Sequence, residues 1–404
     1  MKILMVNKFL YLNGGSETYV LKIGEYLTSI GHEVQYFGMK DDRNIVGNNV
    51  ESYTSNFDFH TGKLKKIIYP FKIIYSAEAR KKIRKILKDF KPDIVHLNNF
   101  NFQITPSIIY EIKKDKIPVI MTVHDPQMVC PNHRLYIESA KKICELCIKG
   151  HYYECIKNKC FHNSKVESIV GAIESYVYHS LKTYDKIDIF LSPSRFMKEI
   201  LIKGGVDVNK ISILPNFSAF SKGDNMIKKE NYVLYFGRIS YEKGIRTLLN
   251  ACLNLKNIKF LFVGSGPMEE ELKAIENVKY IGFKGGKELH ILISQALFTI
   301  YPSEWYENCP LAVIESQVLG TPVIGANIGG IPELIEDRKT GLLFESGNVQ
   351  DLKLKILELY NSPEKLEQMS EECLKKKKNT VDTYCSKLIE LYEKQIQKAS
   401  IVHS

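Results

Sequence analysis

The chain has 404 residues, of which 44% are hydrophobic and 25% are charged. This composition excludes a disordered or fibrous chain and suffices for two packed domains. The net charge of +10 predicts attraction to anions, but it does not choose among nucleotides, acidic glycans, nucleic acid and anionic membranes.

The sequence contains no segment typical of a signal peptide or a membrane-spanning helix. The apolar start at Met1 to Val6 is interrupted by Asn7 and Lys8, and no small-residue cleavage site follows. No apolar run approaches the ~20 residues that a membrane-spanning helix needs. Nine cysteines, an odd number, suit a reducing compartment better than a secreted disulfide framework. We therefore expect a cytoplasmic protein.

Short apolar runs alternate with longer helical patterns through the first half of the chain. The runs predicted to be strands are 2–6, 33–37, 94–97, 118–123 and 188–192. This alternation predicts a parallel α/β domain. Gly14 and Gly15 follow the first run and precede a predicted helix that ends near Gly31, so bare backbone there could approach a phosphate or a sugar hydroxyl. A simple turn explains these glycines as well.

The stretch from Lys63 to Lys91 combines many cations with interleaved apolar residues. Residues 63–71 and 80–88 suit an amphipathic helix on an anionic bilayer. A solvated helix face explains them equally well. Nucleic acid is not an expected partner, because no recognised nucleic-acid motif accompanies the charge.

A cysteine-rich segment at about 130–163 reads as an insertion in this domain. Two cysteine pairs have the ligand spacing of a tetrahedral structural zinc site: Cys144 and Cys147, then Cys155 and Cys160. Nearby histidines offer alternative ligands: His133, His151 and His162. Free thiols in a loop and a redox or disulfide role are the other interpretations.

A polar segment at 215–225 reads as a linker, and a second series of predicted strands follows it. These runs are 232–236, 259–263, 298–301 and 322–324. Two Rossmann-like domains in tandem are therefore predicted to face each other across a hinge. Ligands of open α/β sheets bind beyond the carboxyl ends of the strands, so we expect the binding site in the cleft between the domains. At the end of the chain, 381–397 predicts an amphipathic helix.

Two further glycine loops follow strands of the second series. Gly237 is followed by Arg238 and Lys243, two cations at a position suited to a diphosphate leaving group; a basic surface pair is the alternative. Gly264 lies in Val-Gly-Ser-Gly-Pro, a tight turn that lacks the later glycine of a dinucleotide fingerprint.

Two carboxylates stand eight positions apart, at Glu307 and Glu315. If Glu307 lies in a loop and Glu315 in the helix that follows, a ribose diol can donate two hydrogen bonds to one carboxylate while sugar hydroxyls meet the groups before the helix. The helix N-terminus favours phosphate. A pair of glutamates on a solvated helix is the alternative, which the neighbouring motifs disfavour.

Four motifs, in their order across nearly the whole chain, resemble the retaining glycosyltransferases of family 4, the group-1 class with the GT-B fold. These motifs lie at 13–17, 236–244, 263–267 and 307–315. The resemblance implies transfer of a sugar from a nucleotide-sugar donor, preferably a UDP-sugar, to a glycan or lipid-linked acceptor in the assembly of a surface polysaccharide or glycoconjugate. The predicted domains are an acceptor-binding domain at 1–218, a nucleotide-sugar-binding domain at 230–378, and a helix at 379–404 that returns to the first domain.

The resemblance also implies roles for individual residues. Glu315 matches the ribose-binding glutamate, Arg238 and Lys243 the diphosphate-binding cations, and Glu307 the carboxylate near the donor sugar. Three positions supply backbone N–H groups around the sugar and phosphates, namely Asn308, Cys309 and Leu311, whereas the intervening proline has no N–H to donate. The glycines expected at the donor site are Gly14, Gly15, Gly237 and Gly264.

Two histidines at strand ends are assigned roles by the same resemblance. His124 is implied to contact the donor sugar near its reacting carbon, and His96 is a candidate for the acceptor side. A structural hydrogen-bonding role is the alternative for both. Because the cysteine-rich segment closely follows His124, we expect that segment to border the acceptor side of the site as well.

The leaving diphosphate can be stabilised by Arg238, Lys243 and helix N–H groups, so we expect catalysis to require no metal ion. Both same-face attack and a covalent intermediate remain open for the retaining step. Two other functions also remain open: a nucleotide-sugar epimerase of the same architecture, and a catalytically silent binding protein. The expected location is the cytoplasm, at the inner face of the plasma membrane if the basic stretch binds lipid.

Overall fold

The computed structural model describes residues 1–56, 72–218, 220, 228–376 and 379–401. The chain forms two compact units. Unit 1 comprises Met1–Ser139, Cys144–Pro215 and Val381–Ser404, and unit 2 comprises Ala140–Ile143 and Asn216–Thr380. Each unit contains a six-stranded parallel sheet, which confirms the predicted pair of Rossmann-like domains.

The sheet of unit 1 has the strand order β2-β1-β3-β4-β7-β8, and every neighbouring pair is parallel. Its strands are mostly apolar, as expected for a parallel sheet covered on both faces. After β2 the chain passes to the other side of β1 to form β3, so the strand order reverses between β1 and β3. The strands are β1 (Lys2–Val6), β2 (Glu33–Phe37), β3 (Ile94–Leu97), β4 (Val119–Thr122), β7 (Ile189–Ser192) and β8 (Ile211–Ile213).

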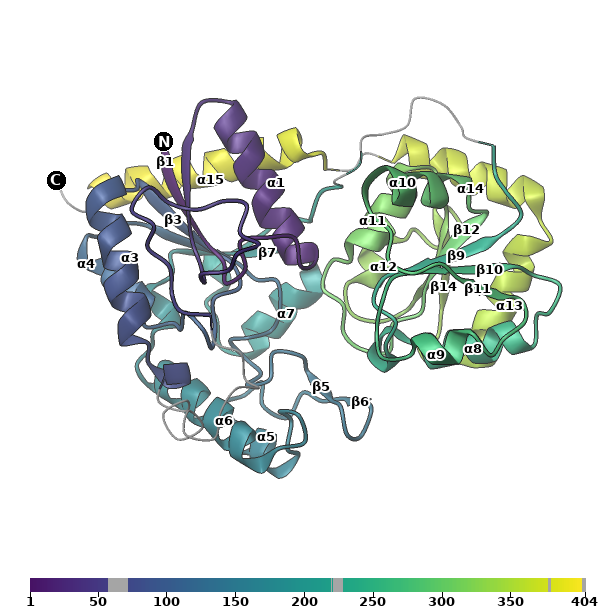
Figure 1. Ribbon diagram of the computed structural model, residues 1–404, viewed down its shortest axis with the longest axis horizontal. Coiled ribbons are helices and arrows are strands. Elements are labelled where there is room, and N and C mark those ends of the chain that lie inside the picture. The colour runs from purple at the N-terminus through teal and green to yellow at the C-terminus, as the bar shows by residue number, and fades with distance from the viewer. Residues whose placement is uncertain (57–71, 219, 221–227, 377–378, 402–404) are drawn as a thin grey trace. The chain divides into compact units, whose positions relative to one another are not determined.

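Three helices of unit 1 begin at serine caps. The side chains of Ser76, Ser164 and Ser194 each accept a hydrogen bond from a backbone N–H three residues on, and so fix the starts of α3, α6 and α7. The last helix, α15, packs against α1 (Figure 1). The helices are α1 (Gly15–Ser29), α3 (Ala77–Phe90), α4 (Ile108–Lys114), α5 (Tyr153–Lys157), α6 (Lys165–Ser180), α7 (Arg195–Lys203) and α15 (Val381–Ile401), with the short 3-10 helices η1 (Tyr184–Lys186) and η2 (Val208–Lys210). The cysteine-rich segment adds a hairpin of β5 (Tyr136–Ile137) and β6 (Lys142–Ile143).

The apolar face of α3 belongs to the core of unit 1. Its buried residues are Ala79, Ile83, Ile86, Leu87 and Phe90. These side chains are not available to a bilayer, so the expectation of an amphipathic helix on a membrane is wrong for residues 80–88, which lie within α3. The other part of that expectation, residues 63–71, lies outside the described residues.

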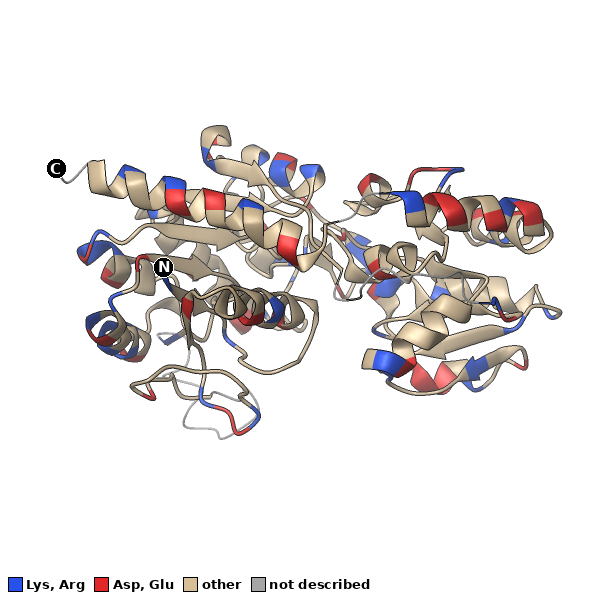
Figure 2. Ribbon diagram, turned by 90° about the horizontal axis from the view of Figure 1, so that it is seen from above, with Lys and Arg blue, Asp and Glu red and all other residues tan. Residues whose placement is uncertain are grey.

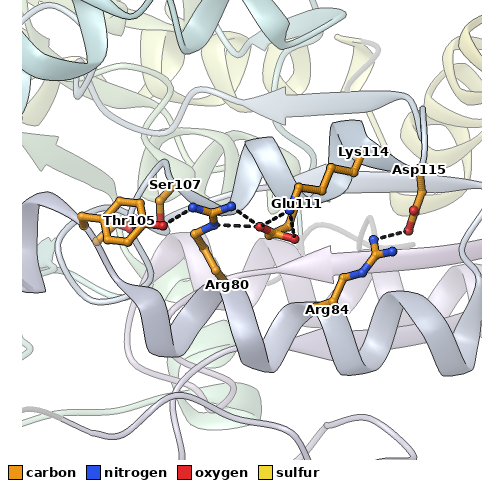
Figure 3. Close-up of polar contacts among 8 residues, drawn as sticks. Arg80, Arg84, Thr105, Ser107, Glu111, Lys114 and Asp115 are labelled. Atoms are coloured by element: carbon orange, nitrogen blue, oxygen red, sulfur yellow. Dashed lines mark hydrogen bonds and ion pairs between the residues drawn. The ribbon is translucent and has the colours of Figure 1, made fainter.

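Two cations of α3 are bound within the unit. Arg80 donates from Nε to Glu111 on α4 at 2.8 Å, and Arg84 donates to Asp115, directly after α4, at 2.6 Å (Figure 3). Burial tends to lower the pKa of Arg80, but its bonds to Glu111 raise it overall. The arginines therefore fasten α3 to α4, whereas the lysines Lys81, Lys85 and Lys88 are exposed as on a solvated helix face.

The sheet of unit 2 repeats the architecture with the order β11-β10-β9-β12-β13-β14, again all parallel, and its strand order reverses between β9 and β12. Helices α8, α9 and α13 cover one face, and α10, α11 and α14 the other (Figure 1). The strands are β9 (Val233–Phe236), β10 (Phe260–Val263), β11 (Val278–Tyr280), β12 (Phe298–Tyr301), β13 (Val323–Ala326) and β14 (Gly341–Phe344). The helices are η3 (Tyr241–Lys243), α8 (Ile245–Leu253), α9 (Glu269–Leu272), α10 (Gly286–Gln295), α11 (Leu311–Val318), α12 (Ile331–Leu334), α13 (Val349–Tyr360) and α14 (Pro363–Lys375).

Cationic and anionic side chains are interspersed on the helices of both units, including α15 (Figure 2). Within the described ranges, no helix combines the length and the apolar character needed to cross a membrane.

Candidate functional site

The loops after β9 and β12 flank the point where the strand order of unit 2 reverses. They are residues 237–244 and 302–310. Ligands of open parallel sheets bind beyond the carboxyl ends of the strands at such a point. Lys243, Arg238 and Glu307 all lie in these two loops.

Glu307 is the centre of a hydrogen-bond cluster. Its Oε1 accepts from Lys243 Nζ at 2.5 Å, from Trp305 Nε1 at 2.6 Å and from Ser303 Oγ at 3.2 Å. The side chains of Glu307 and Lys243 are 11% and 18% exposed, so the ion pair is largely shielded from water. Lys243 also donates to the hydroxyl of Tyr301 at 3.3 Å. Two residues that the sequence analysis singled out, 64 positions apart, are thus in direct contact.

Arg238, the other predicted cation, does not join this cluster. Its side chain is exposed, and its carbonyl accepts a hydrogen bond from Tyr235 Oη at 2.6 Å. Among the residues that the structure describes, Arg238 forms no ion pair. Its guanidinium is therefore accessible to an anion from solution.

Glycines allow the loops around this point to pack closely. Gly264 has a φ of +140°, and a Cβ there would lie 1.9 Å from the carbonyl oxygen of Gly237. At Gly244, with a φ of +73°, a Cβ would lie 1.7 Å from the carbonyl oxygen of Pro302. Only glycine fits such positions. The close approach at Gly244 holds the loop of Lys243 against the loop of Glu307.

Glu315 lies one turn inside α11, which begins at Leu311 directly after the Glu307 loop. Burial raises the pKa of Glu315 to about 7. Hydrogen-bond donors such as ribose hydroxyls would favour its charged form. The N-cap residue of α11, Pro310, forms no side-chain cap, so the first N–H groups of the helix can meet an anion.

The remaining predicted positions of this loop are Asn308, Cys309 and Leu311. Cys309 is buried and packs with Ile314 and Val318, and its carbonyl accepts from Asn216 Nδ2 at 3.0 Å. The thiol of Cys309 therefore packs in the protein interior, and only the backbone of this residue can contact a ligand. Asn308 and Leu311 are partly exposed.

Gly329 and Gly330, which the sequence analysis did not single out, pack closely against the loop of Glu307. Gly330 N donates to the carbonyl of Glu307 at 2.7 Å. A Cβ at Gly329, where φ is +58°, would lie 2.4 Å from that same oxygen. The signal in the sequence that could have identified these residues is a double glycine shortly after a buried strand. Ser303 and Trp305 were also missed, because nothing in the sequence shows which carboxylate their donors meet.

In unit 1 the loops after β1 and β3 occupy the equivalent point of the sheet. Gly14 caps α1 without a side chain, and Gly15 is the first residue of the helix. The loop is fastened by Asn99, whose Nδ2 donates to Ser16 Oγ at 2.9 Å and whose N–H donates to Asn7 Oδ1 at 3.0 Å. These polar residues after buried strands were also missed by the sequence analysis.

His124 follows β4 and is held on two sides. Its Nε2 lies 3.0 Å from Asn98 Oδ1, and its ring meets the ring of Tyr19 edge-on, with centroids 4.9 Å apart. Burial lowers the pKa of His124 to about 4, so the ring is neutral at pH 7. Because the amide oxygen can only accept, Nε2 carries the proton and Nδ1 carries the lone pair.

His96 does not lie on the acceptor side, and this prediction was wrong. The residue is fully buried in β3, with Nδ1 2.6 Å from Tyr392 Oη and Nε2 2.7 Å from Thr122 Oγ1. Both ring nitrogens are bound within unit 1. In a sheet covered on both faces, even a polar residue at mid-strand points into the core.

The cysteine-rich segment forms a small packed cluster. Cys147 and Cys155 are buried with Tyr152 and Ala172, and Cys160 packs against them. The nine cysteines are free thiols. Among the described residues, no group of three or more His, Cys, Asp or Glu side chains is placed to hold a metal ion. The arrangement of Cys144, Cys147, Cys155 and Cys160 therefore does not fit the expected zinc.

Comparison with known proteins gives matches over nearly the whole chain. The family model described as Glycosyltransferase Family 4 matches residues 13–217, and the one described as Glycosyl transferases group 1 matches residues 217–376. A glycosyltransferase of Methanocaldococcus jannaschii is 23% identical over 81% of this chain and 80% of its own length. A 42.6 kDa protein in the cps region of Klebsiella pneumoniae is 25% identical over 83% of this chain and 87% of its own. The solved structure of Anabaena HepE in complex with UDP-glucose superposes with a TM-score of 0.68 at 15% identity, covering 98% of this chain and 100% of that one.

Proposed function

The chain belongs to Glycosyltransferase Family 4 and has the GT-B fold, and from this premise we propose that it transfers a sugar, with retention of configuration, from a UDP-sugar to a glycan or lipid-linked acceptor. The role that we propose for it is the assembly of a surface polysaccharide or related glycoconjugate. The Klebsiella relative in a cps region and the UDP-glucose bound to Anabaena HepE support this choice of pathway and donor.

The observation that carries the proposal is the shielded contact between Lys243 and Glu307 beside an accessible Arg238. A diphosphate that enters this site can form an ion pair with Lys243, in addition to the one that Lys243 forms with Glu307. The guanidinium of Arg238 can bind the same diphosphate in a bidentate manner. Glu307, still held by Trp305 and Ser303, is then available to hydroxyls of the donor sugar. The two cations and the N–H groups of α11 would stabilise the leaving diphosphate electrostatically.

The other roles follow the same proposal. Glu315 accepts hydrogen bonds from the ribose diol, and the backbones of Asn308, Cys309 and Leu311 surround the sugar and phosphates. In unit 1, His124 contacts the donor sugar near its reacting carbon, as a neutral imidazole. Gly14, Gly15, Gly237 and Gly264 give the donor access to the backbone. No step in this scheme requires a metal ion.

The first test is calorimetric titration of UDP, GDP and ADP into the wild type and Glu315→Ala. We expect UDP to bind selectively and the variant to lose about 1.5–3 kcal/mol of binding free energy, because two charge-assisted hydrogen bonds disappear. Trp305 is the single tryptophan of the chain and contacts Glu307, so its fluorescence gives a second readout of the same event. Glu276→Ala, at an exposed glutamate of unit 2, is the matched control and should bind as the wild type does.

Failure of all three nucleotides to bind would refute the donor site. Transfer and epimerisation are separated by analysing the products of UDP-glucose alone and of UDP-glucose with candidate glycan acceptors. A new sugar nucleotide formed without acceptor would identify an epimerase, and binding without any product would identify a silent binding protein.

A further inference from the structure

A continuous chain of four buried hydrogen bonds, called the circuit below, runs through unit 1 and begins and ends on α15. Tyr384 Oη lies 2.6 Å from Tyr19 Oη, which lies 2.9 Å from Thr122 Oγ1. Thr122 Oγ1 lies 2.7 Å from His96 Nε2, and His96 Nδ1 lies 2.6 Å from Tyr392 Oη. All five residues are buried, and they come from α15, α1, β4 and β3.

The circuit has defined donors and acceptors. Burial lowers the pKa of His96 to about 3, so its ring is neutral at pH 7 and donates from one nitrogen while accepting at the other. Each hydroxyl can likewise donate one hydrogen bond and accept another. Every residue along the circuit can therefore donate to the next one in the same order. Such a satisfied network in a dry interior fixes the orientation of its members more firmly than isolated bonds do.

His124 is in contact with this circuit. It stands two residues after Thr122, at the end of β4, and its ring meets the edge of Tyr19. His124 Nε2 also contacts Asn98 Oδ1, and Asn98 Nδ2 donates to the backbone carbonyl of His96 at 3.4 Å. Tyr19 in turn is held at its hydroxyl between Thr122 and Tyr384.

We propose that Tyr384 is a positioning residue for His124, acting through Tyr19. The last helix of the chain thereby sets the orientation of an imidazole that lies 260 positions earlier, counted from 124 to 384. The consequence for catalysis rests on the role proposed above for His124 at the donor sugar; the effect on the orientation of the ring does not.

The test is Tyr384→Phe, which removes one of the two hydroxyls that hold Tyr19 and leaves its bond to Thr122 in place. Ring signals of His124 in a histidine-labelled sample, identified by their loss in His124→Gln, report its orientation without any substrate. We expect Tyr384→Phe to shift these signals. We also expect kcat for release of UDP from UDP-glucose to fall about tenfold with KM nearly unchanged, the effect of one lost positioning bond.

Tyr392→Phe is the matched control, because it removes a hydroxyl from the same helix at an equally short and buried bond, on the side of the circuit away from Tyr19. It should shift the signals of His96 and leave those of His124 in place. Unchanged His124 signals in Tyr384→Phe, or an equal shift in both variants, would overturn the proposal.

Two further outcomes are also decisive. If the wild type releases no UDP from UDP-glucose, the nuclear magnetic resonance comparison still decides on Tyr384, and only the function proposed above is in question. If Tyr384→Phe does not fold, Tyr19→Phe breaks the same bond from its other partner, and the shift of His124 is read there.

Discussion

Glu174 is a carboxylic acid in the core of unit 1 without an evident partner. It lies on α6 at 1% exposure, and its Oε1 has no hydrogen-bond partner among the described residues. Burial raises the pKa of Glu174 to about 8. At neutral pH the residue is therefore mostly protonated in the folded state, whereas in the unfolded chain, with a pKa near 4.5, it is ionised.

This difference predicts how stability depends on pH. Because the folded pKa is raised, the folded state binds the extra proton between about pH 4.5 and pH 8. The contribution of Glu174 to the free energy of unfolding is therefore fully present below pH 4.5 and is lost as pH rises through 8. The free energy of unfolding falls by up to about 1.4 kcal/mol per pH unit in this range. Glu174→Gln removes the ionisation and should gain stability relative to the wild type between pH 6 and pH 8.5.

Urea unfolding at the two pH values measures the effect. Glu199→Gln, at an exposed glutamate of α7, is the control and should keep the pH dependence of the wild type. If Glu174→Gln and the wild type changed in parallel from pH 6 to pH 8.5, the ionisation of Glu174 would not contribute.

Individual site residues were predictable to different degrees. The loop position of Glu307 and the helical position of Glu315 follow from local sequence, since Tyr301 ends an apolar run and the proline before Leu311 starts a helix. The contact of Glu307 with Lys243 bridges 64 positions, so it depends on strand order and no local pattern contains it. His96 was misjudged because its neighbours on β3 do not reveal that both faces of the sheet are covered.

At the scale of elements, Lys229 joins the ends of two helices in unit 2. Its Nζ donates to the carbonyls of Ser294, in the last turn of α10, at 2.9 Å, and of Gly320, just after α11, at 3.2 Å. It also donates to Thr321 Oγ1 at 2.8 Å. A cation is favoured there because the carbonyl ends of both helices carry partial negative charge. Burial nevertheless lowers the pKa of Lys229 to about 8.

Lys229→Met should destabilise unit 2 by about 2–4 kcal/mol, since several buried acceptors lose their donor while the aliphatic packing is kept. The unfolding midpoint in guanidinium chloride, followed by Trp305 fluorescence, measures this effect. Lys228→Met alters the exposed neighbouring lysine and should unfold as the wild type does. Equal midpoints for the two variants would show that the helix ends do not need the cation.

The strands were predictable where they are buried and apolar. β1, β3 and β12 begin and end at the predicted residues, because buried parallel strands are mostly apolar. β2 also matches its predicted bounds, although it is an edge strand that begins with an exposed glutamate. Two strands of unit 2 were missed. β11, at the edge of its sheet, is only partly buried, and β14 follows Thr340 and begins with a glycine, which reads as a turn.

At the scale of the molecule, α15 completes unit 1 from the far end of the chain. It contributes four fully buried residues, Tyr384, Cys385, Leu388 and Tyr392. At about 1.5–3 kcal/mol for each large apolar side chain, their burial is comparable with the total stability of a typical domain. Without α15, the hydroxyl of Tyr19 and the ring of His96 would also lose partners in the core.

A chain that ends at Thr380 should therefore lose the cooperative unfolding of unit 1 and keep that of unit 2. Trp305, the only tryptophan, reports unit 2, while far-ultraviolet circular dichroism reports both units. We expect the fluorescence transition to survive and the dichroism signal to fall. A chain that ends at Ile401, with all of α15 retained, is the control. Two intact transitions in the shorter chain would show that unit 1 folds without its last helix.

The return of α15 also governs the order of events during protein synthesis. Tyr384 is added 365 residues after its partner Tyr19, which at about 5–20 residues per second means a delay of roughly 20 to 70 s. During that time all of unit 2 is synthesised, while unit 1 still exposes the core surface that α15 will cover. Nascent unit 1 is thus the part of the chain that a ribosome-associated chaperone would have to protect.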